Sequence, residues 1–262
     1  MKPMLFLFIL ISGGLTVVGQ NTPAKFVAHR GASYLAPENT MASILLAWEL
    51  GADAAECDIM LTRDNRIVLF HDQTTGRMTG TNLKIRDTDY AVLSQLTIKP
   101  GKHNTEKFDN ERIPLLENIL PTIPDDRLLV IEIKTGTEIL PVLMPIIQQY
   151  SRLERLSFIC FDLETIIETK KYFPSVPCYY LASFRQDIRR YFDVIVQSNL
   201  DGLNLRYKII SRNLTEKCRA AGLDVWCWTV NDPVTAARLI ETGVTHITTD
   251  RPAWLKNQLS RD

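Results

Sequence analysis

The feature that most constrains this chain is a regular alternation of short apolar runs with longer segments whose apolar residues recur at helical spacing. Runs rich in Val, Ile, Leu and aromatic residues are typical of strands buried on both faces, which occur in parallel sheets. The intervening segments are long enough for crossover helices. Strands are predicted at 25–29, 54–61, 128–133, 156–161, 176–182, 202–205, 223–229 and 246–248.

Helices are predicted between these strands. Asn39 or Thr40 caps the first helix, which runs to Leu50, and Pro233 and Pro252 stand at first-turn positions of later helices. Eight strand–helix units over about 240 residues favour an α/β fold, the (β/α)8 TIM barrel. A doubly wound open sheet is the alternative, but no glycine-rich phosphate loop follows the first strand. The later helices are predicted at 115–120, 138–150, 162–172, 187–197, 211–221, 233–241 and 252–259.

One segment interrupts this alternation. After the second strand, a turn at Asp64-Asn65 leads into a returning strand at 66–70. Residues 73–112 then carry many Thr, Gly, Lys, Asp and Asn residues, with one helical stretch at 90–96 and no core pattern of their own. We expect 73–112 to be a short insertion after the second barrel strand that covers the functional site.

Three carboxylates lie at the C-terminal ends of strands, where a TIM barrel places its chemistry. Glu56 and Asp58 share one face of the second strand because side chains alternate along a strand, and Glu132 shares a face with Lys134. Buried carboxylates that face one another repel unless a cation lies between them, and oxygen ligands suit Ca²⁺ or Mg²⁺. The pattern predicts a divalent cation held by Glu56, Asp58 and Glu132. A salt-bridge cluster with Arg30 and Lys134 is the alternative.

Other candidate site residues lie at the same strand ends. His29 and His71 titrate near neutral pH and suit acid–base catalysis. Arg30 and Lys134 suit the binding of an anion such as phosphate. Zinc is disfavoured because Cys57 points to the opposite face of its strand.

Two tryptophans share the inward face of the seventh barrel strand. Trp226 is expected to fill the barrel, and Trp228 is expected to form a wall of the substrate pocket. His103 lies in the insertion and His246 starts the last strand, at the opposite end of the barrel, and neither is assigned a role.

In these residues the chain resembles the glycerophosphodiester phosphodiesterase family, which belongs to the phospholipase C-like TIM barrel superfamily. Each matching piece is short, but the pieces occur in register from residue 27 to 252, so the resemblance spans the predicted domain at 20–262. One departure is Cys160, which precedes Phe161 where the family often has serine. The matching pieces are HRG and PENT (29–31, 37–40), GAD-x-x-E-x-D (51–58), HD (71–72), EIK (132–134), WTVND (228–232) and TDRP (249–252).

The resemblance implies a metal-dependent phosphodiesterase that converts glycerophosphodiesters to sn-glycerol 3-phosphate and an alcohol. The attacking hydroxyl is either the glycerol 2-hydroxyl of the substrate or water. The alternatives are a cyclising lyase of the same superfamily and a non-catalytic binding protein on the same barrel. The roles implied are metal ligands Glu56, Asp58 and Glu132; acid and base His29 and His71; and substrate contacts Arg30, Lys134, Trp228 and Phe161.

Composition narrows the partners of such a protein. With 30 basic and 30 acidic residues the net charge is zero, so the composition does not indicate a nucleic-acid-binding surface.

Residues 1–19 have a positive start, an apolar core and small residues before Gln20, so a cleaved signal peptide and export to the periplasm or the medium are expected. The apolar core is too short for a stable membrane anchor. The five scattered cysteines are expected to be mainly buried thiols, although one disulfide bridge is an alternative.

Overall fold

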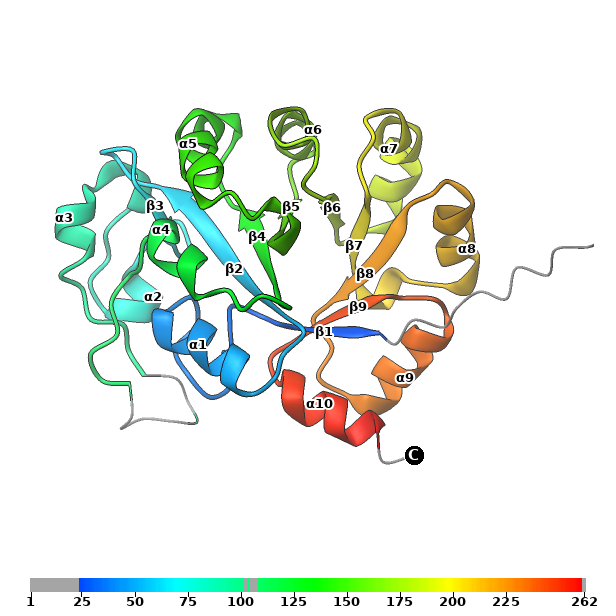
Figure 1. Ribbon diagram of the computed structural model, residues 1–262, viewed down its shortest axis with the longest axis horizontal. Coiled ribbons are helices and arrows are strands. Elements are labelled where there is room, and N and C mark those ends of the chain that lie inside the picture. Colours follow the sequence, from blue (N-terminus) through cyan, green and yellow to red (C-terminus); the bar gives the residue numbers. More distant parts are fainter. Residues whose placement is uncertain (1–23, 101–102, 104–107, 261–262) are drawn as a thin grey trace, which may run out of the picture.

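The computed structural model describes residues 24–100, 103 and 108–260, so the predicted signal peptide lies outside the described residues. Eight parallel strands close into a barrel (Figure 1). The order runs from β1 through β9, β8, β7, β6, β5 and β4 to β2, and pairing of β1 with β2 closes the ring. The predicted TIM barrel is confirmed. The barrel strands are β1 (Lys25–Ala28), β2 (Ala54–Leu61), β4 (Leu128–Ile133), β5 (Leu156–Cys160), β6 (Cys178–Ala182), β7 (Gly202–Arg206), β8 (Asp224–Trp228) and β9 (His246–Thr249).

Helices surround the barrel because each crossover returns the chain along the outside of the sheet (Figure 1). Thr40 caps α1 with its side chain, and Asp162, Ser211 and Asp232 do the same for α6, α8 and α9. In the part of the chain described, no helix is long and apolar enough to cross a membrane. The main helices are α1 (Met41–Glu49), α4 (Leu116–Ile119), α5 (Leu140–Tyr150), α6 (Leu163–Tyr172), α7 (Arg185–Gln197), α8 (Arg212–Ala220), α9 (Pro233–Glu241) and α10 (Pro252–Leu259).

Apolar side chains form two layers, one on each face of the barrel wall. Cys57 and Ile131 lie in the outer layer, between strands and helices. Trp226 is buried in the inner layer with Val130 and Leu181, so it fills the barrel as predicted. All five cysteines are buried and free, which agrees with their prediction as small apolar groups.

The insertion has a core, which the sequence analysis did not predict. After β3 (Ile67–Leu69), which pairs antiparallel with β2, come α2 (Gly76–Thr79), η1 (Ile85–Asp87) and α3 (Tyr90–Leu93). These elements lie outside the helix ring, beside β3 (Figure 1). Ile85 and Leu93 are fully buried against Met60 and Val68 of the β2–β3 hairpin. No core pattern is visible in 73–112 itself because five of the eight buried residues of this core lie outside that segment, so no single segment shows its period.

Short elements complete the path along the chain. They sit mainly at helix starts and between helices and strands, and none contributes to the barrel wall. They are η2 (Leu120–Thr122), η3 (Thr137–Ile139), η4 (Leu153–Arg155) and η5 (Tyr207–Ile209).

His246 closes the N-terminal end of the barrel and makes stability depend on pH. Its ring stacks on Trp226 with centroids 4.1 Å apart. Burial lowers the pKa of His246 from 6.5 to about 4, and the Asp224 carboxylate offsets this only in part. Between these pH values the unfolded chain binds a proton that the folded chain excludes, so stability falls as the pH decreases from 6.5 towards 4.

We expect His246→Phe, which keeps a ring on Trp226, to reduce this dependence. Between pH 7 and pH 5 the wild type should lose roughly 2 kcal/mol more unfolding free energy than the variant. Urea titrations at the two pH values measure the difference, and the comparison cancels other titrating groups. Equal losses in the two proteins would contradict the assignment.

Candidate active site

A cavity of about 250 Å³ opens among the C-terminal ends of the barrel strands. One side of it is charged, and the other side consists of apolar and uncharged polar side chains. Asp58 alone among the predicted site residues does not line the cavity, because it lies buried behind Arg30 and Lys134. The predicted residues that do line it are His29, Arg30, Glu56, His71, Glu132, Lys134, Phe161 and Trp228.

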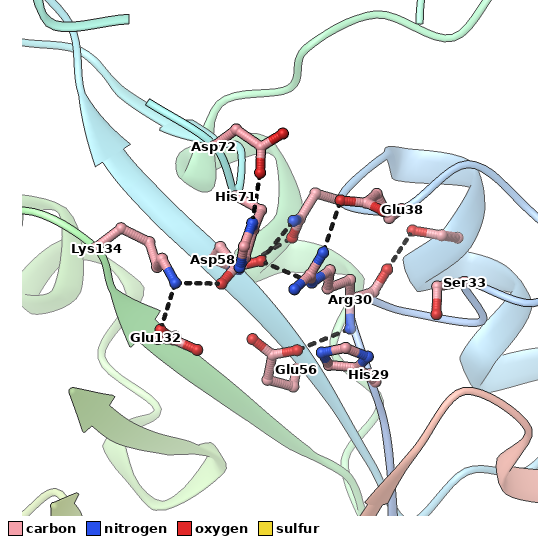
Figure 2. A network of polar contacts seen from close by, with 12 residues as sticks. His29, Arg30, Ser33, Glu38, Glu56, Asp58, His71, Asp72, Glu132 and Lys134 are labelled. Carbon is pink, nitrogen blue, oxygen red and sulfur yellow. Dashed lines mark hydrogen bonds and ion pairs between the residues drawn. The ribbon is translucent and has the colours of Figure 1, made fainter. Parts of the chain in front are cut away.

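Three carboxylates meet at the charged side. Glu56, Asp58 and Glu132 each offer an oxygen, and these oxygens all lie within 4.8 Å of one another (Figure 2). Glu56 and Asp58 are 2% and 1% exposed, and Glu56 Oε1 and Asp58 Oδ1 are buried without a hydrogen-bond donor. Buried carboxylate oxygens without donors suit a hard divalent cation. The three residues therefore fit the predicted metal site.

The pKa values of this cluster follow from its crowding. Burial raises the pKa of Glu56 well above its usual range, and the neighbouring carboxylates of Asp58 and Glu132 raise it further. Burial and the Asp58 carboxylate raise the pKa of Glu132 to about 7, against the opposing effect of Lys134. Without a further positive charge, Glu56 and Glu132 therefore tend to hold protons.

Two positively charged side chains, Lys134 and Arg30, lie against the carboxylate cluster. Lys134 Nζ donates to Glu132 Oε1 at 2.7 Å and lies 3.7 Å from Asp58 Oδ1. Arg30 Nε lies 3.3 Å from Asp58 Oδ2, and Arg30 Nη1 donates to Glu38 at 2.9 Å. The salt-bridge alternative is thus partly realised. It leaves two carboxylate oxygens without donors, so ion pairing and metal binding are compatible here.

A tight turn after β1 carries His29 and Arg30 to the site. Arg30 and Gly31 both have left-handed backbones, with φ of 54° and 76°. A Cβ at Gly31 would also lie 2.5 Å from Ser43 of α1, so only glycine fits there. The turn directs the Arg30 backbone N–H onto Glu56 Oε2 at 2.8 Å. The HRG sequence therefore fixes Glu56 as well as presenting two side chains.

Each histidine is held at Nδ1 by a carboxylate. His29 Nδ1 lies 2.7 Å from Asp250 Oδ1, and Asn231 donates to the other Asp250 oxygen. His71 Nδ1 lies 2.7 Å from Asp72 Oδ1 (Figure 2). An ionised carboxylate only accepts hydrogen bonds, so Nδ1 is the donor in both pairs and Nε2 is the ring nitrogen left to exchange a proton.

The two pairs differ in their surroundings. Arg77 bonds Asp72 and also bridges to Glu38. Burial raises the pKa of Asp72, but the hydrogen bonds from Arg77 and His71 outweigh this and lower it to about 2. Burial lowers the pKa of His71, and the Asp58 and Asp72 carboxylates oppose this. Asp250 has no arginine partner of this kind among the described residues, although its pKa is lowered by His29 against the effect of burial.

Aromatic rings form the wall opposite the charges. Phe161 and Trp228 meet edge to face with centroids 5.5 Å apart, and Trp228 Nε1 donates to the backbone oxygen of Asn204. Lys134 Nζ lies 5.9 Å from the Phe161 ring centroid, so the charged side and the aromatic side of the cavity adjoin at this edge. The thiol of Cys160 donates to the Ile133 backbone, away from the cavity, and burial raises its pKa to about 12.

Some residues at the site were missed by the sequence analysis. Asn39 was considered only as a helix cap, but Thr40 is the cap, and the Asn39 amide both donates to Asp58 Oδ2 and accepts from the Asp58 backbone. Asp72 and Asp250 stood inside recognised motifs without a role. Nothing in the sequence indicated that Asn204 belongs to the site, because a single asparagine in an apolar run is indistinguishable from a turn residue.

The sequence of this chain is similar to those of known glycerophosphodiester phosphodiesterases. A model of the glycerophosphoryl diester phosphodiesterase family matches residues 29–254. A glycerophosphodiester phosphodiesterase of Caldanaerobacter subterraneus subsp. tengcongensis is 34% identical over 238 residues, which cover 88% of this chain and 96% of that protein. A human protein named lysophospholipase D GDPD1 is 23% identical, with 90% of this chain and 86% of that protein covered.

Solved structures show the same architecture. A phosphodiesterase of Oleispira antarctica, solved with the product sn-glycerol-3-phosphate, superposes with a TM-score of 0.82 at 27% identity, covering 90% of this chain and 96% of that one. A glycerophosphodiester phosphodiesterase of Thermotoga maritima gives a TM-score of 0.75 at 24% identity, covering 90% and 99%, and supports the fold alone.

Proposed function

Because this chain belongs to the glycerophosphoryl diester phosphodiesterase family, we propose that it hydrolyses glycerophosphodiesters to sn-glycerol 3-phosphate and an alcohol, with a divalent cation and two histidines. Membership makes it a phosphodiesterase. One observation supports the proposed substrate and mechanism. Two histidines held by carboxylates, three further carboxylates, and the positively charged side chains of Arg30 and Lys134 line or adjoin one small cavity. A binding protein would need no acid–base pair there.

The charged wall suits a phosphodiester anion. Arg30 and Lys134 would bind its non-bridging oxygens with charge-assisted hydrogen bonds. Glu56, Asp58 and Glu132 would hold Ca²⁺ or Mg²⁺, which when bound would neutralise charge developing on the phosphoryl oxygens. Burial of these groups strengthens each of the interactions relative to water.

The histidines would move the protons. One takes the proton from the attacking hydroxyl at its Nε2, and the other gives a proton to the leaving oxygen. Asp250 and Asp72 would keep each Nδ1 protonated and the rings oriented, as carboxylates do for histidine bases. Whether the attacking group is water or the glycerol 2-hydroxyl decides whether a cyclic phosphate is formed on the way.

The test is product release from purified protein. Glycerophosphocholine, glycerophosphoethanolamine and glycerophosphoinositol are assayed for sn-glycerol 3-phosphate with chelator, Ca²⁺ and Mg²⁺ in parallel. We expect release that depends on metal from at least one of them. Lysophosphatidylcholine is assayed in addition, because one relative is named a lysophospholipase D.

The other outcomes separate the alternatives. A cyclic glycerophosphate that accumulates without opening would indicate the lyase. Release that is unaffected by chelator would remove the cation from the proposal and leave the histidines. No turnover of any diester would overturn the proposal.

A further inference from the structure

The side-chain amide of Asn204 is unusually placed. It lies in the middle of β7 and is 1% exposed, and its Oδ1 is buried without a hydrogen-bond partner. No hydrogen bond joins its side chain to any residue that the structure describes, although its backbone oxygen accepts from Trp228. A buried polar group left without a partner costs about 1–3 kcal/mol of stability. A residue of this kind is therefore expected to have a ligand.

The barrel interior explains the direction of this side chain. Leu203 and Leu205 belong to the outer core, so Asn204 between them points inward. Its neighbours in register, Leu181 on β6 and Trp226 on β8, are both interior residues. Asn204 is thus a polar group on an apolar floor, and it lines the catalytic cavity.

Its position relative to the charged wall gives the ligand chemistry. In the closed strand order, β7 lies directly across the barrel from β2, which carries Glu56 and Asp58. A phosphodiester bound at Arg30 and Lys134 would extend the remainder of the molecule towards β7. The cavity of about 250 Å³ is below the range of roughly 300–1,000 Å³ that holds drug-sized ligands, so this remainder is small.

We propose that Asn204 binds a hydroxyl of the glycerol moiety and so selects glycerophosphodiesters over other phosphodiesters. Its amide has two donors and an acceptor, which a hydroxyl group complements in both directions. Thr229 and Thr248 also line the cavity and add hydroxyls, and Trp228 would cover the glycerol carbons. The inference rests on the proposed function and names the residue that reads its substrate.

The test compares two ligands that differ by glycerol alone. Binding of sn-glycerol 3-phosphate and of inorganic phosphate is measured by calorimetry with Mg²⁺ present, for the wild type, Asn204→Leu and Asn204→Ser. We expect both variants to bind sn-glycerol 3-phosphate about 10–100-fold more weakly, as expected when a buried hydrogen-bond partner is lost. Phosphate binding, which depends on the opposite wall, should stay within about threefold.

Stability distinguishes this role from a structural one. Asn204→Leu removes the unpaired amide and keeps its approximate size, so its midpoint of thermal unfolding should equal or exceed that of the wild type. A large fall in that midpoint for both variants would identify a structural residue and overturn the inference. Equal loss of both ligands, or no loss of either, would also overturn it.

Failure of the proposed reaction can be distinguished from failure of the proposed role of Asn204. A wild type that prefers sn-glycerol 3-phosphate to phosphate but hydrolyses no diester would overturn the reaction and leave the Asn204 subsite intact. A wild type that hydrolyses glycerophosphodiesters with no effect of Asn204 substitution on binding would do the reverse.

Discussion

His71→Ala is expected to lower kcat for glycerophosphodiester hydrolysis by about 10²–10⁴-fold, the range of general acid–base catalysis. The reason is that His71 lines the cavity with its Nδ1 held by Asp72, which leaves Nε2 for proton transfer. His29→Ala is expected to act in the same range, because Asp250 holds its ring in the same way. The measurement is steady-state kinetics over a pH series, in which each variant should lose one limb of a bell-shaped profile.

A leaving group of low pKa assigns the two roles. A p-nitrophenyl phosphodiester needs no proton on its departing oxygen, so the variant that lacks the acid should lose much less activity on it than on glycerophosphocholine. The variant that lacks the base should lose activity on both. His103→Ala is the matched control, since His103 stacks on Tyr34 outside the catalytic cavity and should change kcat little. Near-normal activity of either His29→Ala or His71→Ala would contradict the assignment.

Glu132→Gln is expected to abolish the response of the protein to a divalent cation. A cation that stabilises phosphoryl charge contributes several kcal/mol, so loss of the site should cost at least about 10²-fold in activity. In the wild type, chelator should lower activity to the same extent, and added Mg²⁺ or Ca²⁺ should restore it. In Glu132→Gln the same additions should restore little.

Thermal unfolding gives a readout of the site that does not depend on turnover. A cation at about 100 times its Kd should stabilise the wild type by about 2.7 kcal/mol, and this shift should disappear in Glu132→Gln. Glu138→Gln is the matched control, because Glu138 pairs with Arg86 on the surface, where ion pairs contribute little. If Glu132→Gln keeps the shift, the cation does not depend on Glu132 and the proposed ligand set is contradicted. If the wild type shows no shift, the three carboxylates serve as a salt-bridge cluster with Arg30 and Lys134.

The geometry allows the ion pairs and the proposed metal site to coexist. Lys134 pairs with Glu132 and Asp58, and Arg30 pairs with Asp58 and Glu38, and this partial neutralisation lets the chain fold with three acidic groups buried. Glu56 Oε1 and Asp58 Oδ1 remain without hydrogen-bond donors, and the three carboxylates offer oxygens within 4.8 Å of one another. The raised pKa of Glu132, about 7, indicates that the ion pairs alone do not satisfy the cluster.

Local patterns in the sequence were sufficient for the barrel and for one wall of its site. Alternation between apolar runs and helical segments predicted the eight strands, and β2, β4, α9 and α10 have the predicted bounds. Strand parity placed Glu56 with Asp58 and Glu132 with Lys134, because side chains two residues apart on a strand must share a face. These inferences depend only on neighbours in the chain.

Contacts between distant segments were decided by the tertiary structure. Asn39 binds Asp58, Asp250 binds His29, and the insertion shares its core with β2 and β3. Asn204 reaches the cavity beside the carboxylates only because β7 lies opposite β2 in the closed barrel. The sequence alone determined which residues a strand end presents. Only the closed barrel decided which of them meet across it, because that depends on strand order and register, to which every crossover contributes.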